Sequence, residues 1–158
     1  MGLDISYHRN IQRIGDNDYE NEDLDQFNLG ENHKAFPKQA DYLRRGLYRS
    51  EDCDGFGAGA YSSYNRWRDE LAKMAGYKSA EDAWAEEDGG RDSGPFWELI
   101  NFSDCEGHIG PITSAKLAKD FAEHEGGASV RSEWFRTYYS QFRKAFEVAA
   151  QDGVVIFH

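Results

Sequence analysis

The plainest strand patterns lie near the two ends of the chain. Leu3, Ile5 and Tyr7 alternate with polar residues, which is the period of two that is typical of a half-buried strand. The four apolar residues Val154–Phe157 predict a buried strand, because their side chains would otherwise lie in water. The aromatic and apolar run 96–102, bounded by Gly-Pro and Ser-Asp, predicts the strongest strand of all. Residues 42–50 look extended, and the glycine-rich range 55–60 is expected to be irregular.

Apolar side chains spaced three and four residues apart predict about four helices. The helix that ends near residue 151 has the longest apolar stripe, and the short one near residue 80 is expected to turn Ala83 and Trp84 inward. The expected first residues or N-caps are Ser62 or Ser63, Ser79, Thr113 or Ser114, and Ser132. The sequence therefore predicts a single α+β domain, with about four helices packed on a small antiparallel or mixed sheet.

The charge of the chain limits its partners. With 29 acidic against 18 basic residues, the net charge is −11. This balance argues against binding to nucleic-acid backbones and to anionic membrane surfaces, since both need clustered Lys and Arg. Residues 16–25 are rich in acids and predict a solvated loop. The N-terminal sequence lacks the features of a signal peptide, so we expect a cytoplasmic protein with reduced, buried cysteines at positions 53 and 105.

A short motif occurs twice. Residues 52–55 and 104–107 share the pattern Asp-Cys-acid-Gly, and each is followed at a similar distance by an expected helix. This echo predicts two related strand–loop–helix units. Glycine-rich loops that lead into helix N-termini suit an anion, although the acids in these loops oppose one.

Two other functions of these loops, metal binding and thiol catalysis, have little support in the sequence. The acids and cysteines of both loops lack the spacing of a structural zinc site, so no metal and no cofactor is predicted. Cys105 and His108 are candidates for a thiol hydrolase, since a thiolate is favoured before a helix N-terminus. Asp104 and Glu106 would oppose that thiolate.

The segment 61–68 is the better candidate for a ligand site. Tyr or Trp rings stack on a base and an Arg fork fits a phosphate, so this mixture is typical of a nucleotide-sized pocket. The loop 104–110 is the expected second wall, with acids that accept hydrogen bonds from ribose or base. The predicted ligand-binding residues are Tyr61, Tyr64, Asn65, Arg66, Arg68, Asp104 and Glu106. The alternative is that the rings belong to the core and the arginines pair with surface acids.

Three parts of the chain carry a resemblance. The start Met-Gly-Leu-Asp-Ile, the segment 61–68 and the range 101–110 with Ser-Asp-Cys-Glu-Gly resemble small uncharacterised proteins carried by bacteriophages and prophages. The resemblance implies an accessory protein that acts by binding a host defence protein or a signalling molecule, in the cytoplasm of the host cell. It assigns no role to any residue.

The leading hypothesis is a non-enzymatic protein that captures a small nucleotide-like ligand, as a counter-defence function. One alternative is an acidic inhibitor that masks a basic site on a host protein, through residues 16–25 and 81–88. The other is a hydrolase that depends on Cys105. The sequence gives no indication of the oligomeric state.

Overall fold

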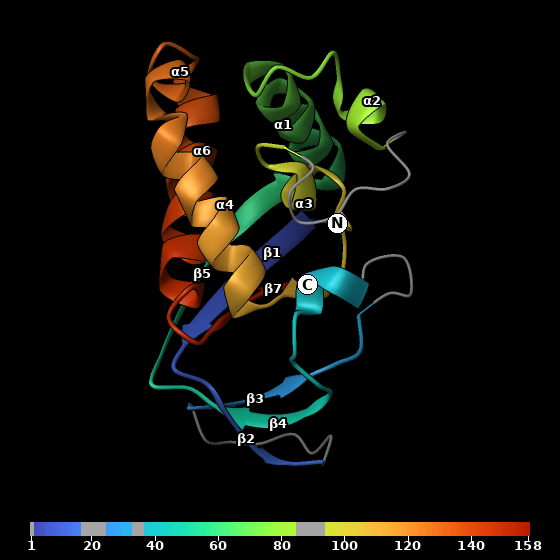
Figure 1. Ribbon diagram of the computed structural model, residues 1–158, viewed down its shortest axis with the longest axis vertical. Coiled ribbons are helices and arrows are strands. Elements are labelled where there is room, and N and C mark those ends of the chain that lie inside the picture. Colours follow the sequence, from blue (N-terminus) through green and yellow to red (C-terminus); the bar gives the residue numbers. More distant parts are fainter. Residues whose placement is uncertain (1, 17–24, 33–36, 85–93) are drawn as a thin grey trace.

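The computed structural model describes residues 2–16, 25–32, 37–84 and 94–158 (Figure 1). The strands are β1 (Gly2–Arg9), β2 (Gln12–Gly15), β3 (Gln26–Leu29), β4 (Gly46–Arg49), β5 (Asp52–Ala60), β6 (Gly107–Ile109) and β7 (Val154–Phe157). The helices are α1 (Tyr61–Met74), α2 (Ala80–Trp84), α3 (Trp97–Ile100), α4 (Pro111–Glu123), α5 (Glu125–Ser129) and α6 (Glu133–Ala149), with a 3₁₀ turn at Pro37–Ala40. The predicted α+β class is confirmed.

The described strands form two antiparallel sheets. One has four strands in the order β5-β1-β7-β6, and the other has three in the order β2-β4-β3. The helices lie together with the larger sheet, and the smaller sheet lies at the other end of the molecule (Figure 1). Both strands predicted at the ends of the chain are confirmed, and they pair with each other in the middle of the larger sheet.

Aromatic rings dominate the core between the larger sheet and its helices. The stripe predicted for α6 is buried, and its Phe142 stacks on Trp67 of α1 with ring centres 4.8 Å apart. Phe157 of β7 contacts the same cluster through Phe102, at 4.9 Å between ring centres. Such ring pairs add to the free energy gained by burial.

A smaller apolar cluster joins the two sheets. It contains Leu29, Tyr48 and Val154 as buried members. His8 of β1 is 7% exposed and stacks on Phe27 of β3, with ring centres 3.9 Å apart. The face of the larger sheet turned away from the helices is thus covered at His8 and Val154, whereas Asp4 and Cys53 on the same side stay exposed.

The strand predicted at 96–102 is wrong, because Trp97–Ile100 is one turn of helix, α3. Phe96 precedes it in the left-handed region, at φ 57°. A short apolar run fits a buried helix as well as a strand, and periodicity cannot separate the two. The turn buries Leu99 and Ile100 completely, which accounts for the apolar composition.

The irregular segment predicted at 55–60 is also wrong, since these residues lie in β5. The ladder with β1 compensates for the entropy that glycine loses on ordering. A Cβ atom at Gly55 would lie 2.6 Å from the carbonyl oxygen of Ile5, so the close pairing of the two strands requires glycine.

Two helix starts differ from the prediction, and two agree. α1 begins at Tyr61 and α4 at Pro111, without the serine or threonine caps expected from the sequence. Asp41 caps α4 instead, since its carboxylate accepts hydrogen bonds from the amide and the hydroxyl of Thr113, both at 2.9 Å. Ser79 and Ser132 accept the predicted capping hydrogen bonds.

Most of the acidic loop predicted at 16–25 lies outside the described residues. Within the described part of the chain, every helix is too short or too polar to cross a lipid bilayer. Trp84, which the sequence placed inward, is half exposed.

Phe157→Ala should destabilise the fold by about 3–5 kcal/mol, because the ring is 2% exposed and its removal leaves a cavity against Phe102 and Phe142. Chemical denaturation measures this loss. Val130→Ala is the control, since Val130 is 84% exposed and should change stability by less than about 0.5 kcal/mol. Equal stabilities of the two variants would contradict the position of β7.

Candidate functional site

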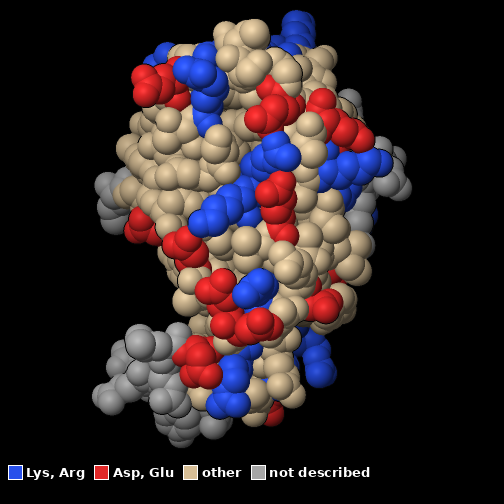
Figure 2. All heavy atoms as spheres, turned by 90° about the vertical axis from the view of Figure 1, so that its left-hand side faces the viewer, with Lys and Arg blue, Asp and Glu red and all other residues tan. Residues whose placement is uncertain are grey.

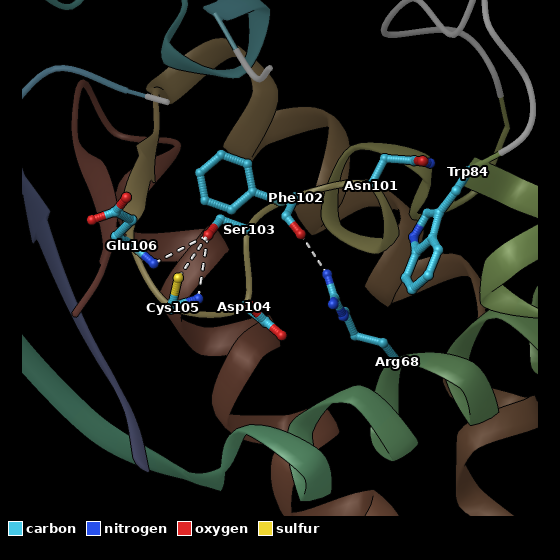
Figure 3. Close-up of a pocket in the computed structure, with 8 residues that line it drawn as sticks. All are labelled: Arg68, Trp84, Asn101, Phe102, Ser103, Asp104, Cys105 and Glu106. Atoms are coloured by element: carbon cyan, nitrogen blue, oxygen red, sulfur yellow. Dashed lines mark hydrogen bonds between the residues drawn. The ribbon is translucent and has the colours of Figure 1, made fainter. Parts of the chain in front are cut away.

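One cavity among the described residues, here called the Trp84 cavity, has a volume of about 590 Å³. It lies where α1 and α2 meet the segment between α3 and β6 (Figure 3). Its walls are Arg68, Trp84, Asn101, Phe102, Ser103, Asp104, Cys105 and Glu106. The volume is in the usual range for a small-molecule pocket.

Arg68 forms the inner wall of this cavity. The residue is 4% exposed, and its Nη1 donates hydrogen bonds to the carbonyl oxygens of Ile100 at 3.2 Å and Phe102 at 2.5 Å. Figure 3 shows the side chain reaching from α1 to the Phe102 carbonyl. The guanidinium therefore ties α1 to the end of α3, and its buried Nε has no hydrogen-bond partner in the described ranges of the chain.

Trp84 provides an aromatic surface at the edge of the cavity. Its indole Nε1 donates a hydrogen bond of 2.7 Å to the Ile100 carbonyl, which fixes the ring orientation. The Arg68 guanidinium lies over the same ring, 5.7 Å from its centre. Because half of the residue is still exposed, the ring is both fixed and accessible.

Acidic groups form the opposite wall. Asp104 is half-buried, and its Oδ2 accepts a hydrogen bond of 2.7 Å from the Asn65 amide. The side-chain Oδ1 of Asn65 in turn accepts a hydrogen bond from Arg68, so the Asn65 side chain links the guanidinium to the Asp104 carboxylate. Glu106 is exposed. The buried guanidinium is therefore linked to the Asp104 carboxylate, and Glu106 adds a second carboxylate to the lining, so that acidic groups outnumber basic ones among the described lining residues.

The sequence-predicted ligand residues divide into three groups. Arg68, Asp104 and Glu106 line the cavity, and Asn65 supports it from behind. Tyr64 is 1% exposed in the core. Two residues belong elsewhere on α1. Tyr61 packs against the core, and Arg66 is exposed with its guanidinium over Trp134, 5.3 Å from the ring centre.

The structure does not bring Cys105 and His108 together. Cys105 is exposed in the Trp84 cavity, with its thiol 3.5 Å from the Ser103 hydroxyl. His108 is 3% exposed in β6 and lines two other cavities. Both cysteines are exposed, so the sequence-based expectation of buried thiols is wrong. β6 also separates Cys105 from the start of α4.

The two copies of the Asp-Cys-acid-Gly motif have different structures. The first begins the edge strand β5, and the second precedes the opposite edge strand β6. The first copy follows a strand, β4, as predicted, whereas the second follows the helical turn α3 and not the expected strand. In the described ranges, no three His, Cys, Asp or Glu side chains are grouped so that they could hold a metal ion.

Sequence reasoning missed four of the lining residues, namely Trp84, Asn101, Phe102 and Ser103. Trp84 was assigned to the core by its helical spacing, and the other three were close to or inside the expected strand. The Ser103 hydroxyl accepts from the amides of Cys105 at 3.3 Å and Glu106 at 3.2 Å, a local turn that the Ser-x-Cys-Glu order could have indicated.

Comparison of the chain with models of protein families, with curated proteins and with solved structures gives no match.

Arg68→Met should destabilise the fold by about 2–4 kcal/mol, because two buried carbonyl oxygens lose a charged donor. Arg66→Met is the matched control, since its ion pair with Glu70 is long, at 3.9 Å, and exposed, and such pairs contribute about 0–1 kcal/mol. Thermal and chemical denaturation compare the two. Equal effects would contradict the buried position of Arg68.

The stability of the fold should fall between pH 7 and pH 5. Burial lowers the pKa of both His8 and His108 to about 4. The unfolded chain, with ordinary histidine pKa values, then binds protons that the folded chain does not, so stability is lost as the pH falls from about 6.5 to about 4. Each histidine should account for roughly 1–2 kcal/mol of this loss.

His108→Gln removes one of these titrating groups. Its stability should therefore fall less steeply with pH than that of the unchanged protein, as measured by denaturant titrations at several pH values. Parallel pH profiles for the two proteins would show that His108 is not buried in the neutral form.

Proposed function

We propose that this protein binds a small nucleotide-like ligand without catalysing its conversion, and that the Trp84 cavity holds the base and sugar of that ligand. The observation that supports this most directly is the pairing of a fixed, half-exposed indole with carboxylates on the facing wall. An indole offers a stacking surface to any planar base, and carboxylates accept from amino and hydroxyl groups.

The charge of the cavity favours the uncharged part of such a ligand. Arg68 is one of the two arginines expected from the sequence as candidates for a phosphate, yet its Nη atoms donate to Ile100, Phe102 and Asn65. Asp104 and Glu106 add two negative charges to the lining of the cavity. A phosphate in the cavity would be repelled, so the phosphate groups of a nucleotide would point to solvent.

Binding is favoured over thiol hydrolysis by the local geometry. Cys105 contacts the Ser103 hydroxyl, and no hydrogen bond joins it to His108 or to another base in the described residues. A nucleophilic cysteine needs an adjacent base or another means of lowering its pKa. A counter-defence role for the binding rests on the resemblance to phage-borne proteins alone.

The acidic-inhibitor alternative receives less support. Residues 17–24 and 85–88, which carry much of the acidic charge in its two ranges, lie outside the described residues. Figure 2 shows basic and acidic side chains interleaved over the face that carries α5 and α6. Pairs such as Lys144–Asp54, at 2.9 Å, and Arg143–Glu147, at 2.8 Å, account for part of this pattern. That face does not present the uniform negative charge that masking a basic site requires.

Calorimetry against nucleosides and their mono-, di- and cyclic phosphates tests the proposal. At least one nucleoside should bind, and it should bind no more weakly than its 5′-monophosphate. Trp84→Ala should weaken binding about tenfold or more, since the loss of one base-stacking ring costs about 1–3 kcal/mol. Trp84→Phe keeps a ring and should retain most of the affinity.

Matched variants act as controls. Trp134→Ala removes an indole outside the cavity, and Arg66→Ala removes an arginine of α1 that does not line it; both should bind like the unchanged protein. Asp104→Asn should weaken binding, whereas Asp52→Asn, at the equivalent position of the first motif, should not. Absence of binding by the whole panel at millimolar concentration would overturn the proposal.

The thiol alternative has its own control. Cys105→Ser and Cys53→Ser should bind ligand equally, and mass spectrometry should recover the ligand unchanged after incubation. A cleaved product that disappears in Cys105→Ser alone would establish the hydrolase instead.

A further inference from the structure

A second cavity lies on the other side of β6, with a volume of about 480 Å³. The loop after β3 and the segment before β4 form it together with His108. The polar residues in its walls are Glu31, Asn32, Arg44, Arg45 and His108. Among the described residues, the linings of this cavity and of the Trp84 cavity have no member in common.

Asn32 fixes one wall of this cavity. The amide of His108 donates to the Asn32 Oδ1 at 2.6 Å, and the Asn32 Nδ2 donates to the His108 carbonyl at 2.8 Å. The asparagine thus takes the place of a neighbouring strand at the edge of the larger sheet, where backbone groups would otherwise lack partners. The position of His108 is therefore well defined without any ligand.

The Nε2 atom of His108 has no hydrogen-bond partner among the described residues. Ile109 points into the core under the helices, so His108, one residue earlier in the strand, faces the smaller sheet. The residue is 3% exposed, and its Nε2 is buried with no hydrogen-bond partner in the described part of the chain. An unpaired buried nitrogen is costly, and a ligand atom at this position would satisfy it.

Positive charge lines the same cavity, although the whole chain carries a net charge of −11. Arg44 and Arg45 are adjacent and exposed, and the carbonyl of Arg45 accepts hydrogen bonds from Arg13 at 3.0 and 3.1 Å, which hold this segment in place. Glu31 offsets one of the two charges. With the imidazole neutral, the described residues of the walls carry a net positive charge, opposite in sign to that of the described residues that line the Trp84 cavity.

We propose that this second cavity binds a phosphate-type oxyanion, with the guanidinium groups of Arg44 and Arg45 and the Nε2 of His108 as hydrogen-bond donors. A guanidinium fork matches the oxygen spacing of a phosphate, and charge-assisted hydrogen bonds are the strong ones. The Nε2–H tautomer of a neutral imidazole supplies the third donor. This proposal does not depend on the proposed function, since it involves different residues and a different ligand chemistry.

Amide and imidazole NMR signals, followed during titration with sodium phosphate at constant ionic strength, test the proposal. The signals of His108, Asn32 and the segment 43–46 should shift with saturation, and sulfate should compete where chloride does not. Arg44→Gln/Arg45→Gln should weaken phosphate binding about tenfold or more. The control Arg66→Gln/Arg136→Gln removes the same charge from the exposed surfaces of α1 and α6 and should leave the affinity unchanged.

Glu31→Gln tests the same site in the opposite direction. Loss of its carboxylate should strengthen phosphate binding severalfold, a gain that misfolding cannot produce. Ribose 5-phosphate distinguishes the sources of the phosphate: binding tighter than inorganic phosphate indicates the phosphate group of a larger ligand. The proposal would be overturned if both double variants bound phosphate with equal affinity, or if chloride displaced the phosphate. NMR shifts confined to residues outside this cavity, or no binding at all, would also overturn it.

Discussion

The pairing of β7 with both β1 and β6 is the constraint on which the rest of the structure depends. β7 comes last in the chain but lies inside the larger sheet, so without it β6 would have no neighbouring strand in that sheet. The turn from α6 into β7 passes so close to β1 that a Cβ atom at Gly153 would lie 1.9 Å from the His8 carbonyl oxygen. The sheet can therefore close only after distant parts of the chain have met, which is typical of slow-folding, non-local topologies.

A buried ionic network places α3, and with it the wall of the Trp84 cavity. The Lys116 ammonium of α4 lies 2.8 Å from the Glu98 carboxylate and 2.7 Å from that of Asp120. Asp120 also accepts from the Phe96 amide at 2.9 Å, which holds the residue that starts α3. Burial raises the pKa of Glu98, while Lys116 opposes that shift. Loss of one partner from this network would leave a buried charge without compensation, which is strongly destabilising. The network therefore fixes the position of α3.

Sequence periodicity predicted the parts of the fold that repeat over many residues. The stripe of α6 and the alternation in β1 are of this kind, and both were confirmed. It failed at α3, where four residues are too few to distinguish a helix from a strand, and at the cap of α4, which Asp41 supplies from 72 residues away. For the cavity, Arg68 and Asp104 were found by residue type. The structural role of Arg68 could not be predicted from the sequence, because the carbonyl groups that accept its hydrogen bonds lie in the segment 96–102, which was expected to be a strand.

The segment 106–108, at the start of β6, lies between the two cavities. A third cavity, of about 230 Å³, shares Glu106 with the Trp84 cavity and His108 with the second cavity, which Arg44 and Arg45 line. The two residues are separated by one position, and the sign of the local charge changes between them: carboxylates prevail on one side and guanidinium groups on the other. Hydrogen-bond donors are therefore favoured at one end of this short segment and oxyanions at the other. A single ligand class cannot satisfy both ends equally, so the two proposed ligands, a nucleoside and a phosphate, would bind at opposite ends of the segment 106–108.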